Sequence, residues 1–128
     1  MINYLFVALG SAVGGMARFA CSGLAARYIS DSYPWGTLLI NISGSLFLGA
    51  LAAAIPEDGR IWFVSDARAL LMVGVCGGFT TFSSFSLETV NLARSGAWAP
   101  AAGYVAASFV LCIGAAALGY FGALALQR

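Results

Sequence analysis

Long uncharged segments divide this chain into four hydrophobic units. Charged residues are absent from 32–56, 69–87 and 95–127, which are segments of 25, 19 and 33 residues. The first 26 residues are also largely apolar, with Arg18 as their one charged side chain. A helix needs about 20 mostly apolar residues to cross the hydrocarbon core of a bilayer. The pattern therefore predicts an all-α membrane protein with four transmembrane helices, near residues 3–26, 35–55, 69–92 and 100–126.

Proline and tryptophan residues mark the ends of these predicted helices. Pro34 and Pro100 occur where helices should begin, a position at which the missing N–H of proline costs little. Pro56 is expected to end the second helix. The tryptophans fall at helix edges or in the long loop, as interfacial belts of membrane proteins favour; they are Trp35, Trp62 and Trp98.

Composition agrees with a membrane protein and excludes other classes. Hydrophobic residues make up 61% of the chain and charged residues 9%, with a mean hydropathy of +0.91. A soluble domain carries roughly a quarter charged residues. A net charge of +1 without a basic cluster excludes nucleic-acid binding. No polar stretch is long enough for a separate soluble domain, so we expect residues 1–128 to form a single transmembrane domain.

Several side chains that carry chemistry are missing. There is no His, which removes the imidazole base and the usual zinc ligand, and no Lys to form a Schiff base. We expect no enzymatic activity. The three cysteines lie far apart inside apolar segments, which excludes a disulfide framework and favours a role as small buried apolar residues for Cys21, Cys76 and Cys112.

Arginine positions give almost no topological bias. Four spans place both termini on the same side of the membrane, and positive charge in short loops sets orientation. Three arginines fall on the side of the termini and two or three on the other: Arg60, Arg68 and Arg128 against Arg27, Arg94 and the nearby Arg18. This balance favours two interpretations about equally. The chain inserts in both orientations, or it has a single topology that is only weakly oriented.

Polar residues form one stripe on each of the last three spans. Residues three or four apart share a helix face, and the stripes are Thr37, Asn41 and Ser45; Thr81, Ser84 and Glu88; and Tyr104, Ser108 and Cys112. Ser and Thr commonly bond their own helix backbone or hold helices together. The Asn41 amide is harder to satisfy in that way, because unpaired polar groups in hydrocarbon cost several kcal/mol. Three aligned stripes predict a shared hydrophilic seam.

The middle of the third span predicts a broken helix. Its sequence is Gly77-Gly78-Phe79-Thr80-Thr81, and paired glycines followed by β-branched residues weaken a helix. A break at 77–81 would free backbone carbonyls in the membrane, which is tolerated where they line a cavity or meet a ligand. The alternative is that Gly77 and Gly78 merely allow close helix packing.

Two aromatic and two ionisable residues complete the candidate site. Phe82 and Phe85 follow the break, and their positive ring edges, together with hydroxyl donors, could stabilise a small anion without a full charge. The alternative is that both rings simply face lipid or core. Arg18 and Glu88 lie within spans, where charges are functional candidates by default. Snorkelling to the interface is the competing structural role for both.

These residues resemble the CrcB/Fluc family of fluoride channels over essentially the whole chain. The most specific stretch is 74–88, GVCGGFTTFSSFSLE. A second is 36–49, GTLLINISGSLFLG, and a weaker one is 14–19, GGMARF. The resemblance implies a fluoride-selective channel in a bacterial plasma (inner) membrane, built as an antiparallel dual-topology homodimer with two pores.

The resemblance also assigns residues to the anion pathway and to a cation. Phe82 and Phe85 would line the pores beside Asn41, and Tyr104 and Ser108 would match further pore positions. Thr37, Thr81, Ser84 and Glu88 would complete the polar track. A structural Na⁺ at the dimer axis would be held by backbone carbonyls, with Gly77 and Thr80 as the matching positions. Arg18 would match the vestibule arginine.

The expected activity is passive export of fluoride, which reduces fluoride toxicity in the cytoplasm. Fluoride would enter as the neutral acid, ionise, and leave through the pore down its gradient. The second interpretation is a small proton-coupled dual-topology multidrug exporter, which needs a carboxylate within the first span; here that span has none, and Glu88 lies near the end of another. A third is a structural assembly subunit, which leaves the aligned polar stripes without a role.

Overall fold

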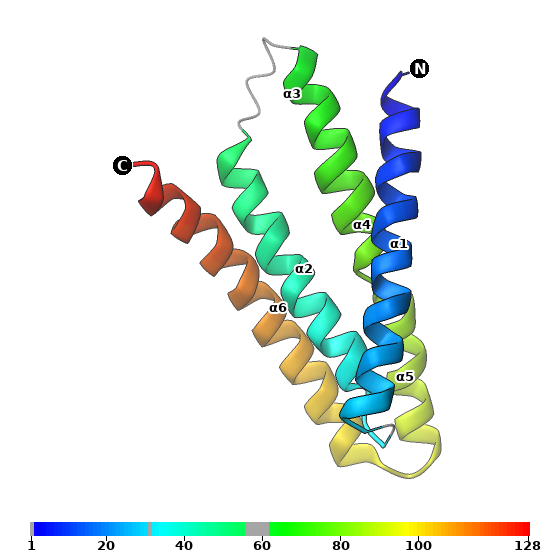
Figure 1. The fold of residues 1–128 in the computed structure, drawn as a ribbon. Helices are drawn as coiled ribbons and strands as arrows, with labels where there is room; N and C mark the ends of the chain where they lie inside the picture. The colour runs from blue at the N-terminus through cyan, green and yellow to red at the C-terminus, as the bar shows by residue number, and fades with distance from the viewer. Residues whose placement is uncertain (1, 31, 56–61) are drawn as a thin grey trace.

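The computed structural model describes residues 2–30, 32–55 and 62–128 as a bundle of helices (Figure 1). Four helical spans are long and apolar enough to cross a membrane, which confirms the predicted number, and the described ranges contain no strand. The elements are α1 Ile2–Tyr28, α2 Trp35–Ala54, α3 Trp62–Ala67, the π-helix η1 Arg68–Cys76, α4 Gly77–Phe79, α5 Phe82–Arg94 and α6 Trp98–Leu126.

Helices α2 and α6 begin close to the starts that the proline and tryptophan positions predict. Trp35 and Trp98 are the first residues of α2 and α6, with Pro34 at the N-cap of α2 and Pro100 in the first turn of α6. Gly96, whose φ of 82° favours glycine, lies in the turn between α5 and α6. The expected roles of Pro56 and Arg60 lie outside the described residues. Both termini lie at the same end of the bundle (Figure 1).

The third span is broken, but over a shorter segment than predicted. Gly77 and Gly78 are helical, and only Thr80 and Thr81 have extended backbone, with φ and ψ of −80° and 156° and of −151° and 112°. Gly78 serves close packing instead, because a Cβ there would lie 2.7 Å from the Ser11 carbonyl oxygen of α1. The helix is therefore broken at Thr80 and Thr81, whereas close helix packing is the role of Gly78.

A π-helix precedes the break, which the sequence pattern did not predict. In η1 the backbone hydrogen bonds reach back five residues, and the Gly77 amide accordingly donates to the Met72 carbonyl. This widened helix lies directly on α1. A Cβ at Gly10 would overlap the Leu70 carbonyl oxygen, and a Cβ at Gly14 that of Val75. Backbone contact between α1 and η1 thus fixes the first half of the third span.

A second tight contact joins α2 to α6. A Cβ at Gly49 would overlap the Ala116 carbonyl oxygen, and a Cβ at Gly119 would overlap that of Leu46. Small residues at such positions let membrane helices approach closely. The bundle therefore consists of two close helix pairs, α1 with the third span and α2 with α6, as Figure 1 shows.

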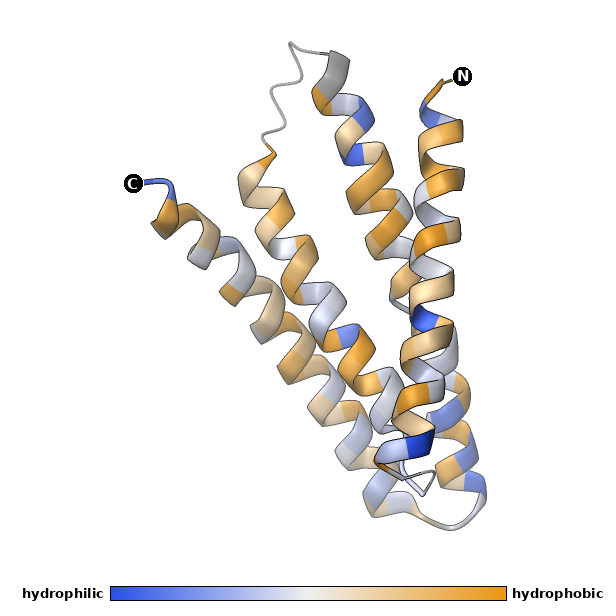
Figure 2. Cartoon of the chain, viewed as in Figure 1, coloured by the Kyte–Doolittle hydropathy of each residue, from blue (hydrophilic) through white to orange (hydrophobic). Residues whose placement is uncertain are grey.

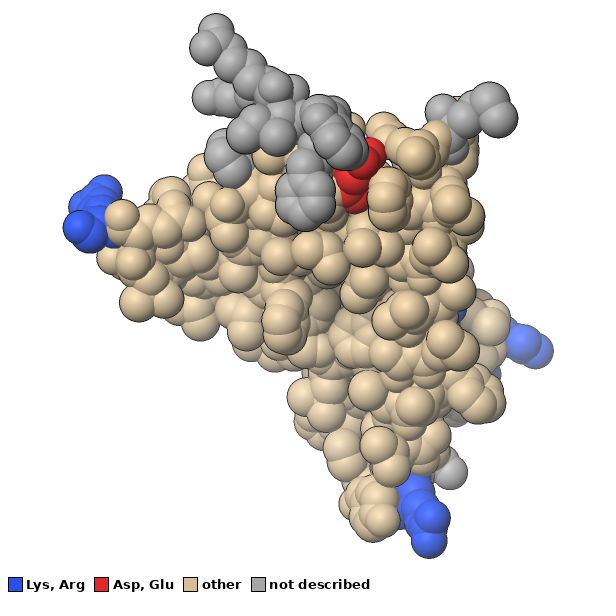
Figure 3. Space-filling model, turned by 45° about the horizontal axis from the view of Figure 1, so that its top comes forward, with Lys and Arg blue, Asp and Glu red and all other residues tan. Residues whose placement is uncertain are grey.

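The apolar surface matches a lipid environment. Hydrophobic positions predominate along the helices (Figure 2), and many large apolar side chains are exposed, among them Phe19, Phe47 and Phe121. On the face shown in Figure 3 the charged side chains lie at the extremities. The buried core cluster is small and consists of Leu38, Phe85 and Tyr104, beside the polar seam. The cysteine prediction is confirmed only for Cys76, since Cys21 is exposed and Cys112 is half-buried. Cys21 lies on the outer side of α1, where its small apolar side chain suits lipid.

Candidate functional site

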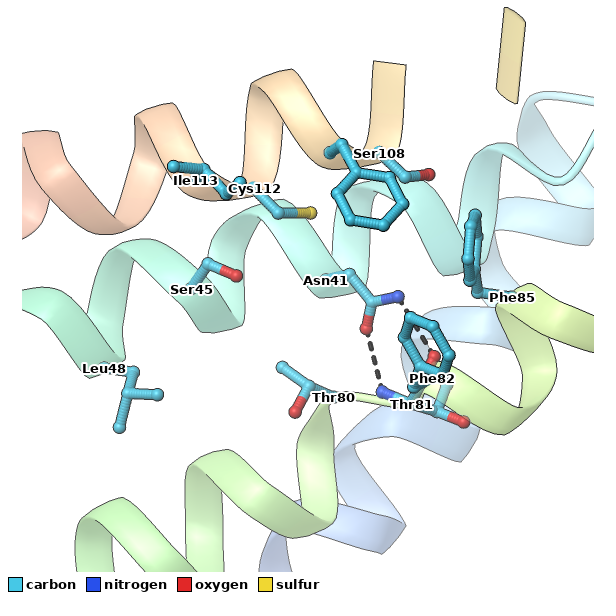
Figure 4. A pocket seen from close by; sticks show the side chains of 11 residues that line it. Asn41, Ser45, Leu48, Thr80, Thr81, Phe82, Phe85, Ser108, Cys112 and Ile113 are labelled. Carbon is cyan, nitrogen blue, oxygen red and sulfur yellow. Dashed lines mark hydrogen bonds between the residues drawn. The ribbon is translucent and has the colours of Figure 1, made fainter. Parts of the chain in front are cut away.

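A cavity of about 330 Å³ lies between α2, the break and α6 (Figure 4). It has the size of a small-ligand pocket. Among the described residues, no Asp, Glu, Lys or Arg lines it. The lining residues are Asn41, Ser45 and Leu48 of α2; Thr80, Thr81, Phe82 and Phe85 of the break and α5; and Ser108, Phe109, Cys112 and Ile113 of α6.

Asn41 holds the broken segment through two hydrogen bonds. Its Nδ2 donates to the Thr81 carbonyl oxygen at 3.1 Å, and the Thr81 amide donates to its Oδ1 at 2.8 Å. The side chain thereby replaces the partners that an unbroken helix would supply to Thr81. An amide nitrogen carries two donor hydrogens, so the second N–H of Asn41 remains for the cavity that the residue lines.

Thr81 caps the following helix and thereby sets the direction of α5. Its Oγ1 accepts a hydrogen bond from the Ser84 amide at 3.2 Å, and it also lies 3.0 Å from the Ser84 Oγ and 3.2 Å from the Ser83 Oγ. Such N-caps stabilise a helix by about 1 kcal/mol. Because α5 begins immediately after this cap, the position of Thr81 fixes where Phe82 and Phe85 lie.

The two phenylalanines differ sharply in burial. Their ring centroids are 5.1 Å apart, yet Phe85 is 7% exposed and Phe82 is 71% exposed. Phe85 packs on the Tyr104 ring at 5.2 Å and meets the Phe109 ring edge-on at 6.4 Å. Phe85 is therefore a wall of the cavity, while Phe82 lies at its open side.

Glu88 is fixed by two hydroxyl groups on neighbouring helices. Thr37 Oγ1 donates to Glu88 Oε1, and the Tyr104 hydroxyl donates to Oε2, both at 2.7 Å. Thr37 and Tyr104 are buried. Tyr33, from the segment before α2, meets the Tyr104 ring edge-on at 5.6 Å. These bonds join α2, α5 and α6 on the far side of Phe85 from the break.

Ser108 has a hydroxyl without a protein partner. Its side chain is 8% exposed and lines the cavity, and its Oγ is the one buried side-chain polar atom without a hydrogen bond in the described part of the chain. Several other hydroxyls in the spans bond the backbone of their own helix, as those of Ser43, Ser86 and Thr89 do. A buried hydroxyl without a partner costs about 1–3 kcal/mol, so Ser108 is available for a ligand in the cavity.

The break also changes which backbone carbonyls are paired. In an unbroken helix the Gly77 carbonyl would accept from the Thr81 amide and the Thr80 carbonyl from the Ser84 amide. Both amides donate to side chains instead, to Asn41 Oδ1 and Thr81 Oγ1. The Gly77 and Thr80 carbonyl oxygens are therefore without their helical hydrogen-bond donors at the break. Described residues include no group of three or more His, Cys, Asp or Glu side chains placed to hold a metal.

Most of the predicted site residues lie together. The cavity brings together Asn41, Thr81, Phe82, Phe85 and Ser108. Thr37, Glu88 and Tyr104 form the adjoining network, and Ser84 belongs to the cap of α5. Arg18 does not join them, because it lies on α1, which contributes no residue to the cavity. The prediction missed Phe109, Leu48 and Ile113 as lining residues, and Tyr33 beside Tyr104. Phe109 directly follows Ser108, but it is not part of the polar stripe on that helix, so the sequence pattern did not indicate it.

Comparison with known proteins identifies the family of this chain. The family described as CrcB-like protein, Camphor Resistance (CrcB), matches residues 5–120. A relative from Rhodospirillum rubrum is 50% identical over 127 residues, covering 99% of this chain and 98% of its own, and one from Opitutus terrae is 48% identical, covering 99% and 96%. A third, from Paramagnetospirillum magneticum, is 45% identical over the full length of both chains. All three are named "Fluoride-specific ion channel FluC". The resemblance identified from residues 74–88 is thereby confirmed, and the chain belongs to the CrcB family.

Proposed function

We propose that this protein is a fluoride-selective channel of a bacterial inner membrane, through which fluoride leaves the cell passively. The observation that carries the proposal is the unpaired Ser108 hydroxyl in a cavity that also holds the spare Asn41 N–H and the Phe85 ring. The names of the full-length relatives support the same ion. Fluoride enters as its neutral acid, ionises in the cytoplasm, and leaves through this pathway.

The uncharged lining suits an ion that must be dehydrated and then released. Fluoride is small and tightly hydrated, so several donors at close range must replace its water. Hydroxyl, amide and ring-edge donors do this without a fixed positive charge, which would hold the ion too strongly for conduction. Donors at close range fit the small fluoride ion better than a larger halide, which favours selectivity against chloride.

An antiparallel homodimer completes the pathway. Phe82 is 71% exposed at the open side of the cavity, and an aromatic ring that lines an ion pathway requires a second wall. A second copy inserted in the opposite orientation supplies that wall, and two pores follow by symmetry. The even distribution of arginines between the two membrane sides supports insertion in both orientations.

A structural Na⁺ at the break forms the second part of this proposal. Na⁺ is a hard cation that takes oxygen ligands, and the carbonyls of Gly77 and Thr80 have lost their helical donors. Two copies related by a dyad would bring two such carbonyls each to the ion. Arg18 is proposed to make the pore entrance positive, which raises the local anion concentration.

Fluoride efflux from liposomes is the direct test of this function. Purified protein is reconstituted with internal potassium fluoride, and efflux is followed with a fluoride electrode after valinomycin is added. We expect rapid fluoride efflux and no chloride efflux from matched vesicles. Equal chloride flux contradicts selectivity, and the absence of any flux favours the structural-subunit interpretation.

A proton-coupled multidrug exporter is the alternative that the same vesicles test. Its mechanism needs a carboxylate that binds and releases protons, whereas Glu88 is held by the Thr37 and Tyr104 hydroxyls on both of its oxygens. We expect fluoride efflux that follows the fluoride gradient alone and no uptake of a cationic dye driven by a pH gradient. Dye uptake that depends on Glu88 would support the exporter.

A further inference from the structure

A cysteine thiol lies on the wall of the cavity. Cys112 of α6 is half-buried and lines the cavity together with Ser45 of α2. Figure 4 shows its sulfur pointing from α6 toward α2, between the labelled positions of Ser45 and Asn41. The two other thiols have different surroundings, because Cys21 is exposed on α1 and Cys76 is buried in η1.

A second observation indicates that this part of the cavity has room for a ligand. Ser108 lies four residues before Cys112 on the same face of α6 and lines the same cavity. Its Oγ is buried without a partner, although the side chain is 8% exposed. The wall that α6 contributes to the cavity therefore carries, one helical turn from Cys112, a polar atom without a hydrogen bond from any described residue.

We propose that Cys112 is a binding site for soft, thiol-seeking metal ions, and that an ion bound there obstructs the anion pathway. The obstruction rests on the proposed function, whereas the binding of metal to Cys112 does not. Soft thiolate ligands select soft metals, and a neutral organometallic halide can enter a cavity whose lining, within the described part of the chain, carries no charge. Bound at Cys112, the metal occupies the space between α6 and α2 through which an anion reaches Ser108 and Phe85.

Methylmercury chloride is the probe, and its reaction with the thiol is balanced. The Cys112 sulfur forms a bond to mercury, the mercury–chlorine bond breaks, chloride leaves, and the thiol proton passes to the solvent. No electron is transferred, so no oxidant is needed. An excess of dithiothreitol takes up the methylmercury and returns the free thiol, which makes the modification reversible.

The experiment compares three proteins in fluoride-loaded liposomes. These are the wild type, Cys112→Ser, and the double variant Cys21→Ser/Cys76→Ser, in which Cys112 is the remaining thiol. Intact-mass spectrometry counts the methylmercury groups and peptide mapping locates them, while fluoride efflux is recorded for each protein relative to its own untreated rate. Because the double variant keeps Cys112, the test stands even where Cys112→Ser does not fold.

We expect labelling of Cys112 in the wild type and the double variant, with a loss of efflux that follows the labelled fraction and is restored by dithiothreitol. Cys112→Ser should keep its own rate, even though Cys21 is labelled. Failure of the reagent to label Cys112 in the folded double variant, when it labels the same protein unfolded in sodium dodecyl sulfate, overturns the site. Full labelling with unchanged efflux overturns the obstruction.

The mass readout separates this inference from the proposed function. If the untreated wild type carries no fluoride, the proposed function fails, and the obstruction fails with it. Labelling of Cys112 in the folded double variant then still establishes the metal-binding site. If untreated efflux is rapid but Cys112 stays unlabelled, the channel stands and the site is rejected.

Discussion

Asn41 and Thr81 are joined by a reciprocal pair of hydrogen bonds, 3.1 Å from amide to carbonyl and 2.8 Å from backbone N–H to amide oxygen. The residue that the sequence marks as a pore donor is therefore also the residue that closes the break. Removing it should disturb the fold of the third span as well as any ion that passes.

Asn41→Leu should lower both stability and fluoride flux. The substitution orphans the N–H and the carbonyl of Thr81, each at about 1–3 kcal/mol, and it removes the donor that lines the cavity. Thermal unfolding in detergent and liposome efflux measure the two effects. Ser43→Ala is the matched control on α2, because Ser43 bonds the backbone of its own helix. An unchanged melting temperature for Asn41→Leu would contradict the structural role.

Glu88→Gln should be milder than Glu88→Leu. Gln keeps one acceptor oxygen for either hydroxyl and offers an N–H that the other hydroxyl can accept, whereas Leu strands the buried hydroxyls of Thr37 and Tyr104. Each stranded group costs about 1–3 kcal/mol. Chemical unfolding of both variants, and of Thr37→Val combined with each, checks the network. Equal destabilisation by Gln and Leu would show that these hydroxyls do not depend on the carboxylate oxygens.

Phe82→Ile and Phe85→Ile should separate conduction from folding. Phe82 is mostly exposed, so its replacement should leave the melting temperature nearly unchanged while fluoride efflux falls. Phe85 packs against Tyr104 and Phe109, so Phe85→Ile should cost about 1–2 kcal/mol in addition to the loss of efflux. Melting curves and efflux from the same preparations provide the comparison. Normal efflux in both variants is the result that rejects the pathway.

Gly119→Ala should destabilise the protein, whereas Gly122→Ala should not. A Cβ at Gly119 overlaps the Leu46 carbonyl oxygen, while nothing lies within 4 Å of a Cβ at Gly122. Overpacking of this kind costs about 1–3 kcal/mol, and a Gly to Ala change in an open helix gains up to about 1 kcal/mol. Unfolding by sodium dodecyl sulfate of the two variants compares them directly. Equal behaviour of the pair contradicts the close contact between α2 and α6.

Removal of Na⁺ should weaken the proposed dimer. Dialysis into N-methylglucamine buffer leaves the Gly77 and Thr80 carbonyls without the cation, and their mutual repulsion across the dyad then opposes association. Analytical ultracentrifugation in detergent and the efflux rate report the change, and returning Na⁺ should restore both. A dimer that is indifferent to Na⁺ would argue against the cation site.

The four spans were predictable because a helix that crosses the bilayer must be apolar over a length that the bilayer sets. The polar stripes were predictable from the periodicity of the helix, which places residues four apart on one face. Asn41 and Ser45 on α2 and Ser108 and Cys112 on α6 lie on faces that meet at the cavity. Family membership followed from the uncommon string at 74–88.

The details of the third span could not be obtained from local sequence. Gly77 and Gly78 stay helical, since η1 packs on α1 and holds them, while Thr80 and Thr81 extend because a side chain 40 residues away satisfies the Thr81 backbone. The π-helix at Arg68–Cys76 makes backbone contact with Gly10 and Gly14 of α1, and no periodicity in its own residues reveals that contact. The pairing of Glu88 with two hydroxyls likewise depends on how three helices meet.

The side chain of the extended Thr80 packs against Gly44 of α2. A Cβ added at Gly44 would overlap the Thr80 Cγ2 methyl group, and the Phe79 ring lies only 3.2 Å from the same point. The space between positions 44 and 80 thus holds one methyl group. Either residue 44 or residue 80 can supply it, but not both. Substitutions at 44 and 80 should be epistatic: Gly44→Ala is tolerated once Thr80 is Ser, and an evolving lineage would change the two sites together.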